Sequence, residues 1–325
     1  MKPRIVAYGR VREKARNKLS EKYEVSHFND GEDLSNEAFK KAINEASAFI
    51  VGELEVGQEL LDHAPLLKVV SNVSVGYDNL DIDELTKRGI AATNTPGVLN
   101  ETTADAVFGL LLAAARRIPE LDQYVKRGEW KGLLPEEKFG IDVHHKTLGI
   151  IGMGRIGEAI AKRAHFGFDM NILYHNRSRK PGLENKFNAE YCSLDKLLEE
   201  SDHVCLMTPL TPETHHLMGA EQFKRMKKSA VFVNGSRGLT VDEGALVDAL
   251  QKGEIRAAAL DVFQEEPVSP DHPLLHMGHV ITTPHLGSAT AETEDRMSML
   301  AAENADAVLE GMRPPNLINK NVFSH

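Results

Sequence analysis

Three residues in the last third of the chain have side chains suited to reducing a keto acid: Arg237, Glu266 and His285. A guanidinium can bind a carboxylate through paired hydrogen bonds, and an imidazole with a carboxylate partner can donate a proton near neutral pH. The three lie in the stretches NGSRG, LDVFQEEP and PHLGSAT, each of which follows a strand pattern. Because ligands of open α/β sheets bind beyond the carboxyl ends of strands, the three side chains can share one site. Each also has a plainer alternative: helix capping for the arginine, a surface loop for the glutamate and a structural role for the histidine.

A glycine-rich stretch, LGIIGMGRIG, places Gly152, Gly154 and Gly157 between an apolar strand pattern and a helix pattern. Glycines at this spacing permit a tight turn and let the backbone approach a pyrophosphate, which rests on the helix N-terminus. The alternative is an ordinary glycine-rich turn. The order of strand, glycines and helix favours a dinucleotide site, since this is the context that the motif requires.

About twenty residues later, at the end of the next strand pattern, the chain reads HNRSRK over residues 175–180. An NAD-binding fold is expected to place Asp or Glu there, to accept hydrogen bonds from the adenosine ribose. Arg177 and Arg179 can instead form charge-assisted hydrogen bonds with the 2′-phosphate of NADP, with Asn176 and Ser178 as further donors. The stretch therefore predicts that NADP(H) is preferred and that NAD(H) is possible. The alternative is a solvated basic loop.

Composition and length narrow the class of protein. A chain of 325 residues is long enough for two domains, and a formal net charge of −10 argues against a nucleic-acid partner. The longest apolar run, Val107–Ala115, is too short to span a bilayer, and the first residues lack the pattern of a signal peptide. The two cysteines, Cys192 and Cys205, lie in apolar stretches. We therefore expect a cytoplasmic protein with reduced thiols and no membrane partner.

Short apolar strand patterns alternate with amphipathic helix patterns, which is typical of parallel α/β sheets. One series of strands occupies the first hundred residues, and a second begins at residue 146. A long helical pattern over residues 101–128 separates them, and another long helix follows the second series. We predict two doubly wound parallel-sheet domains, with a Rossmann nucleotide-binding domain (102–286) inserted into a flavodoxin-like substrate-binding domain (1–101 and 287–325).

The motifs together resemble the D-isomer-specific 2-hydroxyacid dehydrogenase family over nearly the whole chain. The resemblance lies in SVGYDN, GMGRIG, PLTPETHHL, NGSRG, LDVFQEEP and PHLGSAT. Within that family, DVHHKTLGIIGMGRIG and RAHFGF are similar to the bacterial glyoxylate/hydroxypyruvate reductases, which are also described as 2-ketogluconate reductases. One departure is Thr208, where many members carry histidine.

The resemblance implies a role for each motif residue. Arg237 would bind the substrate carboxylate, and His285 would donate a proton to the keto oxygen. Glu266 would orient His285 and raise its pKa, with the adjacent Glu265 as the alternative partner, so reduction should weaken as pH rises. The backbone at Val75 and Gly76 would bind the substrate carboxylate. Cofactor contacts are implied for Thr103, Arg155, Ile156, Pro209, Thr214, Ser236, Asp261 and Gly287. Asp261 has an alternative role in pairing with nearby backbone.

The resemblance also implies a homodimer that acts on a small 2-keto acid. The adjacent pairs His144–His145 and His215–His216 point in diverging directions and lack nearby ligands, so no metal site is expected. The alternatives are an NAD-linked D-2-hydroxyacid or D-3-phosphoglycerate dehydrogenase, and a protein that senses dinucleotides and binds partners.

Overall fold

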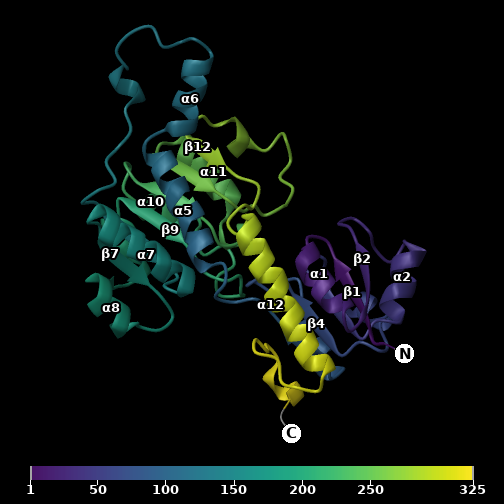
Figure 1. Cartoon of the computed structure of the whole chain (residues 1–325). Helices are drawn as coiled ribbons and strands as arrows, with labels where there is room; N and C mark the ends of the chain where they lie inside the picture. Colours follow the sequence, from purple (N-terminus) through teal and green to yellow (C-terminus); the bar gives the residue numbers. More distant parts are fainter. Residues whose placement is uncertain (1, 324–325) are drawn as a thin grey trace. The chain divides into compact units, whose positions relative to one another are not determined.

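The computed structural model describes residues 2–323, which divide into two compact units (Figure 1). The first unit comprises Met1–Leu99 and Ala289–His325, and the second comprises Asn100–Ser288. The predicted boundaries, after residues 101 and 286, each lie two residues from these divisions. The second unit is thus a continuous stretch, while the first is formed from both ends of the chain.

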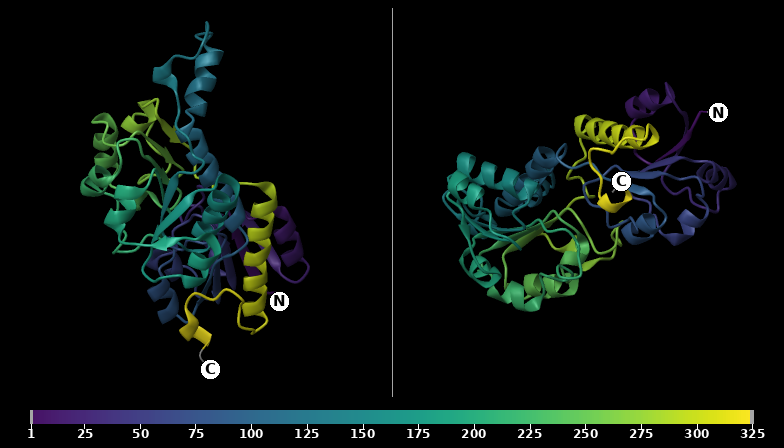
Figure 2. Two further views of the ribbon diagram at one scale, coloured as in Figure 1. Left: turned by 90° about the vertical axis from the view of Figure 1, so that its left-hand side faces the viewer. Right: turned by 90° about the horizontal axis from the view of Figure 1, so that it is seen from below.

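The first unit contains a five-stranded parallel sheet in the order β2-β1-β3-β4-β5. Its strands β1, β3, β4 and β5 are almost entirely buried, as expected for parallel strands covered on both faces. Helix α12 packs against β3, β4 and α1, and Figure 2 shows it alongside these strands. The elements are β1 (Arg4–Tyr8), α1 (Glu13–Ser20), β2 (Glu24–Phe28), α2 (Glu37–Asn44), β3 (Ala48–Val51), α3 (Gln58–Asp62), β4 (Val69–Asn72), α4 (Ile82–Lys87), β5 (Ala91–Thr93), α12 (Ala291–Leu309) and η4 (Lys320–Phe323).

The second unit contains a seven-stranded parallel sheet in the order β12-β11-β10-β9-β6-β7-β8. Strand order reverses between β6 and β9, which is where dinucleotides bind in doubly wound folds. The strands are β6 (Thr147–Ile151), β7 (Asn171–His175), β8 (Glu190–Tyr191), β9 (His203–Leu206), β10 (Val231–Asn234), β11 (Ala257–Leu260) and β12 (Val280–Thr282). The two parallel-sheet domains predicted from the sequence are confirmed, although the short strand β8 was not expected.

Helices cover both faces of this second sheet. They are α5 (Asn100–Ala115), α6 (Ile118–Lys126), η1 (Glu136–Lys138), α7 (Arg155–Phe168), α8 (Pro181–Phe187), α9 (Leu194–Glu200), α10 (Ala220–Arg225), η2 (Gly238–Thr240), α11 (Glu243–Gln251) and η3 (Pro273–His276). The apolar run Val107–Ala115 lies in α5, which packs on α7, β10 and β11. None of the helices described over residues 2–323 is long and apolar enough to cross a membrane.

The long helical pattern over residues 101–128 is interrupted, so the prediction of one continuous helix was wrong. Arg117 adopts left-handed backbone angles with φ of 56°, and Pro119 lies in the first turn of the helix that follows. The Arg117 guanidinium pairs with Glu120 at 2.8 Å, which holds the chain in this turn. Apolar periodicity continues across residues 116 and 117, but a proline near the start of a helix marks a new beginning.

Candidate active site

The glycine loop after β6 is shaped by close backbone contacts. Gly152 has φ of 102°, and a Cβ there would lie 2.6 Å from the carbonyl oxygen of Met207. A Cβ on Gly157 would overlap the carbonyl oxygen of Gly152. At Gly154, in contrast, no described atom outside its chain neighbours lies within 4 Å of the Cβ position. Gly152 and Gly157 therefore close the turn, while Gly154 leaves open space at the N-terminus of α7.

This open space fits the pyrophosphate of a dinucleotide. Helix α7 is 14 residues long and begins at Arg155, with Gly154 as its N-cap residue. The first N–H groups of a helix have no partner within the helix, and the helix dipole favours an anion at that end. A side chain at position 154 would occupy the space where the anion approaches. Gly154, Arg155, Ile156 and Gly157 are thus the residues that would hold the phosphates.

The basic stretch after β7 contains two arginines with different surroundings. Arg179 donates to both carboxylate oxygens of Glu184, at 2.8 Å from Nε and 2.7 Å from Nη2. Glu184 also accepts from the Tyr174 hydroxyl at 2.6 Å, so Arg179 is part of a fixed cluster at the start of α8. Arg177 is exposed. The hydrogen bond from Thr211 and a backbone hydrogen bond lower the pKa of Glu213, and the charge of Arg177 adds to this effect. Arg177 is therefore the better placed of the two to meet an incoming phosphate.

The remaining polar side chains near this end of the sheet are engaged within the unit. The Asn176 amide donates to the Ser178 carbonyl at 2.9 Å. The Thr214 hydroxyl donates to the Pro209 carbonyl at 2.7 Å, and the Ser236 hydroxyl donates to Asn234 at 2.8 Å. These bonds set the shape of the loops that follow β7, β9 and β10.

His285 and Glu266 form a direct hydrogen bond, 2.8 Å from Nδ1 to Oε2. The second oxygen of Glu266 accepts from the Phe263 N–H at 2.9 Å. Glu266 is thus the partner, and the alternative Glu265 is not. Since Nδ1 faces the carboxylate, Nε2 is the ring nitrogen that can carry a proton to a substrate. The imidazole is 44% exposed, so a ligand can reach it.

In the His285–Glu266 pair, each group stabilises the charged form of the other. The hydrogen bond to Glu266 raises the pKa of His285 above its usual value, against the opposing effects of burial and of the Arg237 charge. Burial acts to raise the pKa of Glu266, but hydrogen bonds from His285 and from the Phe263 N–H outweigh it and lower that pKa. The charge of Arg237 acts in the same direction. Each group of the pair therefore favours the charged form of the other.

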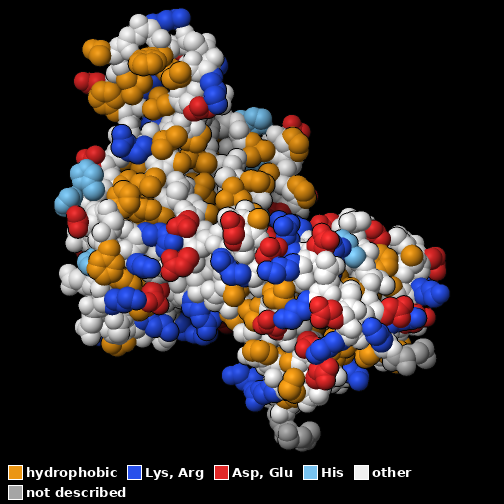
Figure 3. All heavy atoms as spheres, viewed as in Figure 1, with side chains coloured by type: hydrophobic (Ala, Val, Ile, Leu, Met, Phe, Trp, Pro, Cys, Tyr) orange, Lys and Arg blue, Asp and Glu red, His pale blue; other side chains and the backbone are white. Residues whose placement is uncertain are grey.

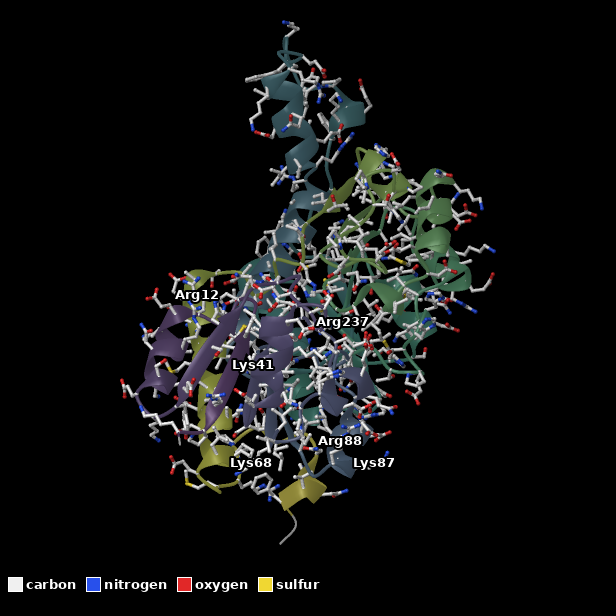
Figure 4. All side chains as sticks on the ribbon, turned by 90° about the vertical axis from the view of Figure 1, so that its right-hand side faces the viewer. Arg12, Lys41, Lys68, Lys87, Arg88 and Arg237 are labelled. Atoms are coloured by element: carbon white, nitrogen blue, oxygen red, sulfur yellow. The ribbon has the colours of Figure 1, made fainter. Side chains whose placement is uncertain are left out.

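Arg237 follows β10 and is labelled in Figure 4. Its carbonyl oxygen accepts from Asn234 at 3.1 Å and from Thr240 at 2.6 Å, which fixes the backbone that carries it. Its charge reaches both Glu266 and His285. A cation, a carboxylate and an imidazole thus interact beyond the ends of β10, β11 and β12, and their roles in a reaction stay predictions.

Comparison with known proteins shows which family the chain belongs to. The family model described as "D-isomer specific 2-hydroxyacid dehydrogenase, NAD binding domain" matches residues 108–287. The chain belongs to this family. It is 48% identical over 322 residues to glyoxylate/hydroxypyruvate reductase B of Escherichia fergusonii, covering 99% of each chain. It is 49% identical over 319 residues to the enzyme of the same name from Cronobacter sakazakii, covering 98% of each.

A solved structure is similar over the full length. The NADPH-dependent glyoxylate/hydroxypyruvate reductase of Sinorhizobium meliloti, in complex with NADP and malonate, superposes with a TM-score of 0.89 at 32% identity. The match covers 100% of this chain and 99% of that one. The resemblance inferred from the motifs is therefore confirmed, and this D-2-hydroxyacid dehydrogenase is an oxidoreductase with a nicotinamide-cofactor domain.

Asp261 anchors the loop that carries His285. Its carboxylate accepts from the N–H groups of Leu286 and Gly287, both at 2.8 Å, and from the Thr283 hydroxyl at 2.6 Å. Its carbonyl accepts from the His285 N–H at 2.9 Å. These bonds hold His285 in a left-handed conformation with φ of 51°, which is strained for a residue with a Cβ. In this dehydrogenase Asp261 thus pairs with nearby backbone, and its contact with the cofactor stays a prediction.

Thr103, on α5, lies beside this anchored loop. A Cβ on Gly287 would lie 3.2 Å from the Thr103 methyl group and 3.1 Å from a carboxylate oxygen of Asp261. Thr103, Asp261 and Gly287, three of the positions expected to contact the cofactor, are therefore neighbours within the second unit. Thr208, the departure from the family pattern, has a buried hydroxyl without a hydrogen-bond partner among the described residues.

Val75 and Gly76 lie in the first unit, in the loop after β4. Two asparagines hold this loop: Asn94 donates to the Val75 carbonyl at 2.8 Å, and Asn72 donates to the Gly76 carbonyl at 2.7 Å. Both carbonyls are thus engaged within the unit, which fixes the orientation of the peptide groups that were expected to bind a carboxylate.

The histidine pairs do not assemble a metal site. His144 and His145 approach each other through their Nδ1 atoms at 2.9 Å, and His215 stacks on His216 with ring centroids 4.1 Å apart. Over residues 2–323 there is no group of three or more potential ligands that could hold a metal ion.

Sequence reasoning missed two residues that support the site, Glu243 and His272. Their side chains are paired, 3.1 Å from Oε2 to Nε2, and Glu243 also accepts from the backbone of the segment that carries Glu266. The only local signal was the helix start in TVDEGAL, where an acid in the first turn is ordinary. Their role depends on contacts between distant parts of the chain.

Proposed function

We propose that this dehydrogenase uses NADPH to reduce small 2-keto acids to D-2-hydroxy acids, with glyoxylate and hydroxypyruvate as substrates and 2-ketogluconate as a further one. The observation that carries the proposal is the His285–Glu266 hydrogen bond beside the charge of Arg237. The names of the two curated relatives and the NADP complex of the Sinorhizobium protein support the substrate class and the cofactor.

Each proposed residue has one task. Arg237 binds the substrate carboxylate through its guanidinium, and the backbone at Val75 and Gly76 binds it as well. His285 donates the proton on Nε2 to the keto oxygen, while Glu266 holds the ring and keeps it protonated. When bound, the nicotinamide cofactor supplies the hydride. Arg177 binds the 2′-phosphate that distinguishes NADP from NAD.

The phosphorylated-substrate alternative has less support. A phosphate would call for cations in the first unit in addition to Arg237, and Figure 4 labels some of the cations of that unit. Arg88 pairs with Asp62 at 2.6 Å and with Glu84 at 2.7 Å. Arg12 pairs with Asp295 at 2.9 Å. Because carboxylates neutralise these two guanidiniums, neither supports a phosphate site, and the proposal is made for the unphosphorylated keto acids.

The enzyme is proposed to be a homodimer. The segment from α6 through η1, residues 118–139, exposes a set of large apolar side chains, visible as the upper projection in Figure 3. They are Ile118, Val125, Trp130, Leu133, Leu134 and Phe139. Leu133 is 99% exposed, which is costly in water unless another surface covers it. A second copy of the chain is the proposed cover, and the two free, buried cysteines favour a cytoplasmic location.

The test is a substrate panel with both cofactors. Loss of NADPH absorbance on addition of glyoxylate, hydroxypyruvate or 2-ketogluconate measures reduction directly, and D-3-phosphohydroxypyruvate and pyruvate serve as comparison substrates. We expect the highest kcat/KM with NADPH and glyoxylate or hydroxypyruvate. Faster turnover of the phosphorylated acid with NADH would refute the proposal.

A further inference from the structure

The segment that carries Glu266 has no regular secondary structure of its own. Residues 261–267 run from the end of β11 into a loop, and Gln264, Glu265 and Glu266 are all exposed at its surface. The bond between Glu266 and the Phe263 N–H lies within the segment and cannot attach it to the rest of the fold. Gln264 attaches the segment instead: its side-chain amide donates to the Val241 carbonyl and its N–H donates to Glu243, both at 2.7 Å.

Glu243 makes the contact that acts on the backbone of the segment. It is the first residue of α11, is 8% exposed, and its Oε1 accepts from the Gln264 N–H at 2.7 Å. Its other oxygen lies 3.1 Å from Nε2 of His272. The His272 Nδ1 accepts from the Leu274 N–H, so Nε2 bears the hydrogen and faces Glu243. Both oxygens of this buried carboxylate therefore have a polar neighbour, as burial requires.

The segment also touches the backbone next to Arg237. A Cβ on Gly238 would overlap the carbonyl group of Phe263 and the nitrogen of Gln264. The peptide between Phe263 and Gln264 is thus packed against Gly238 on one side and bonded to Glu243 through its N–H. The backbone segments that carry Arg237 and Glu266 thus meet at this peptide, and the bond from the Gln264 side chain to the Val241 carbonyl lies beside it.

We propose that Glu243, held by His272, is a positioning residue that places Glu266 against Nδ1 of His285. The inference rests on the catalytic roles proposed above for His285 and Glu266. Glu243 touches neither the imidazole nor the Glu266 carboxylate, and acts through the peptide at Gln264. If that peptide shifts, the Glu266 carboxylate moves away from His285. The charges facing the imidazole would then be dominated by Arg237 and Asp261.

Two conservative variants separate the effect of the length of the Glu243 side chain from the effect of its charge. Glu243→Asp keeps the charge but shortens the side chain, so the 2.7 Å bond to Gln264 is lost. Glu243→Gln keeps the length and one acceptor oxygen. Since small misplacements of catalytic groups cost up to about 100-fold in rate, we expect kcat of Glu243→Asp to fall about tenfold. The alkaline limb of its pH profile should move to lower pH, and KM for NADPH should stay within about twofold. Glu243→Gln should retain most of the activity and the original limb.

Matched controls are available on exposed helix positions. Glu221→Asp makes the same shortening in the first turn of α10, and Asp248→Asn removes a charge from α11. Neither should change kcat or the pH profile. Hydrogen exchange over residues 262–267 reports on the peptide itself, and should be faster in Glu243→Asp than in Glu243→Gln.

The outcomes distinguish this inference from the proposed function. Faster exchange with unchanged kcat and an unchanged alkaline limb would overturn the positioning role. An unchanged limb in Glu266→Gln would instead refute the His285–Glu266 pair on which the role depends. If Glu243→Asp does not fold, the His272→Gln variant tests the proposal in its place. This variant leaves Glu243 in place and should move the alkaline limb to lower pH by a smaller amount. A kcat and an alkaline limb equal to those of the wild type would overturn the proposal.

Discussion

Replacing Arg177 by Ala tests how this dehydrogenase selects its cofactor. Arg177 is exposed at the end of β7, whereas Arg179 already donates three hydrogen bonds to Glu184, between 2.7 and 3.0 Å. For Arg179 to bind a phosphate, these bonds would have to break. The selection of NADPH over NADH should therefore depend mainly on Arg177, although both arginines occur in the same short stretch.

The size of the effect follows from the kind of bond lost. A hydrogen bond to a charged group contributes about 1.5–3 kcal/mol. Since each 1.4 kcal/mol is a factor of ten, Arg177→Ala should lower the ratio of kcat/KM for NADPH to that for NADH roughly 10- to 150-fold. Because Arg177 is exposed, salt should weaken its contribution, and values at the low end of the range are expected at high ionic strength.

The assay is reduction of glyoxylate at varied NADPH and NADH, for wild type and three variants. Arg179→Ala should change the cofactor ratio by less than Arg177→Ala. Arg225→Ala makes the same substitution at an exposed, carboxylate-paired arginine on α10 and should leave the ratio unchanged. An Arg177→Ala enzyme with an unaltered ratio, or a larger effect of Arg179→Ala, would refute this reading of the loop.

Two further predictions concern the proton donor and the subunit interface. Because Glu266 raises the pKa of His285, reduction should decline as pH rises through that raised value, and Glu266→Gln should move the decline to lower pH in a kcat/KM profile. A limb at the same pH in both enzymes would contradict the pairing. Leu133→Asp should convert a dimer to monomers in light-scattering measurements, because it places a charge at a contact proposed to be apolar. The control Leu66→Asp, at an exposed leucine of the first unit, should leave the dimer intact. A Leu133→Asp dimer as stable as wild type would exclude this segment as the interface.

Local patterns in the chain were sufficient to predict the fold and the main chemical groups. The succession of apolar strands and amphipathic helices depends on neighbouring residues, and so predicts two parallel sheets without knowledge of the contacts between them. The glycines at 152, 154 and 157 act through their own backbone, so their spacing alone predicts a phosphate-binding turn. The same holds for His285 and Glu266, since each lies in a distinctive motif at the end of a strand.

The sequence by itself therefore determined the family, the order of the elements and the types of the reacting groups. Only the tertiary structure decided which groups are paired, because pairing depends on where distant parts of the chain meet. Glu243 meets Gln264 across 21 residues, and Asp261 meets Leu286 across 25. The two arginines of one short stretch differ because Glu184, on the next helix, faces Arg179 and not Arg177. Such contacts leave no periodic pattern in the sequence, because each forms only where the packing of helices and strands brings distant segments together.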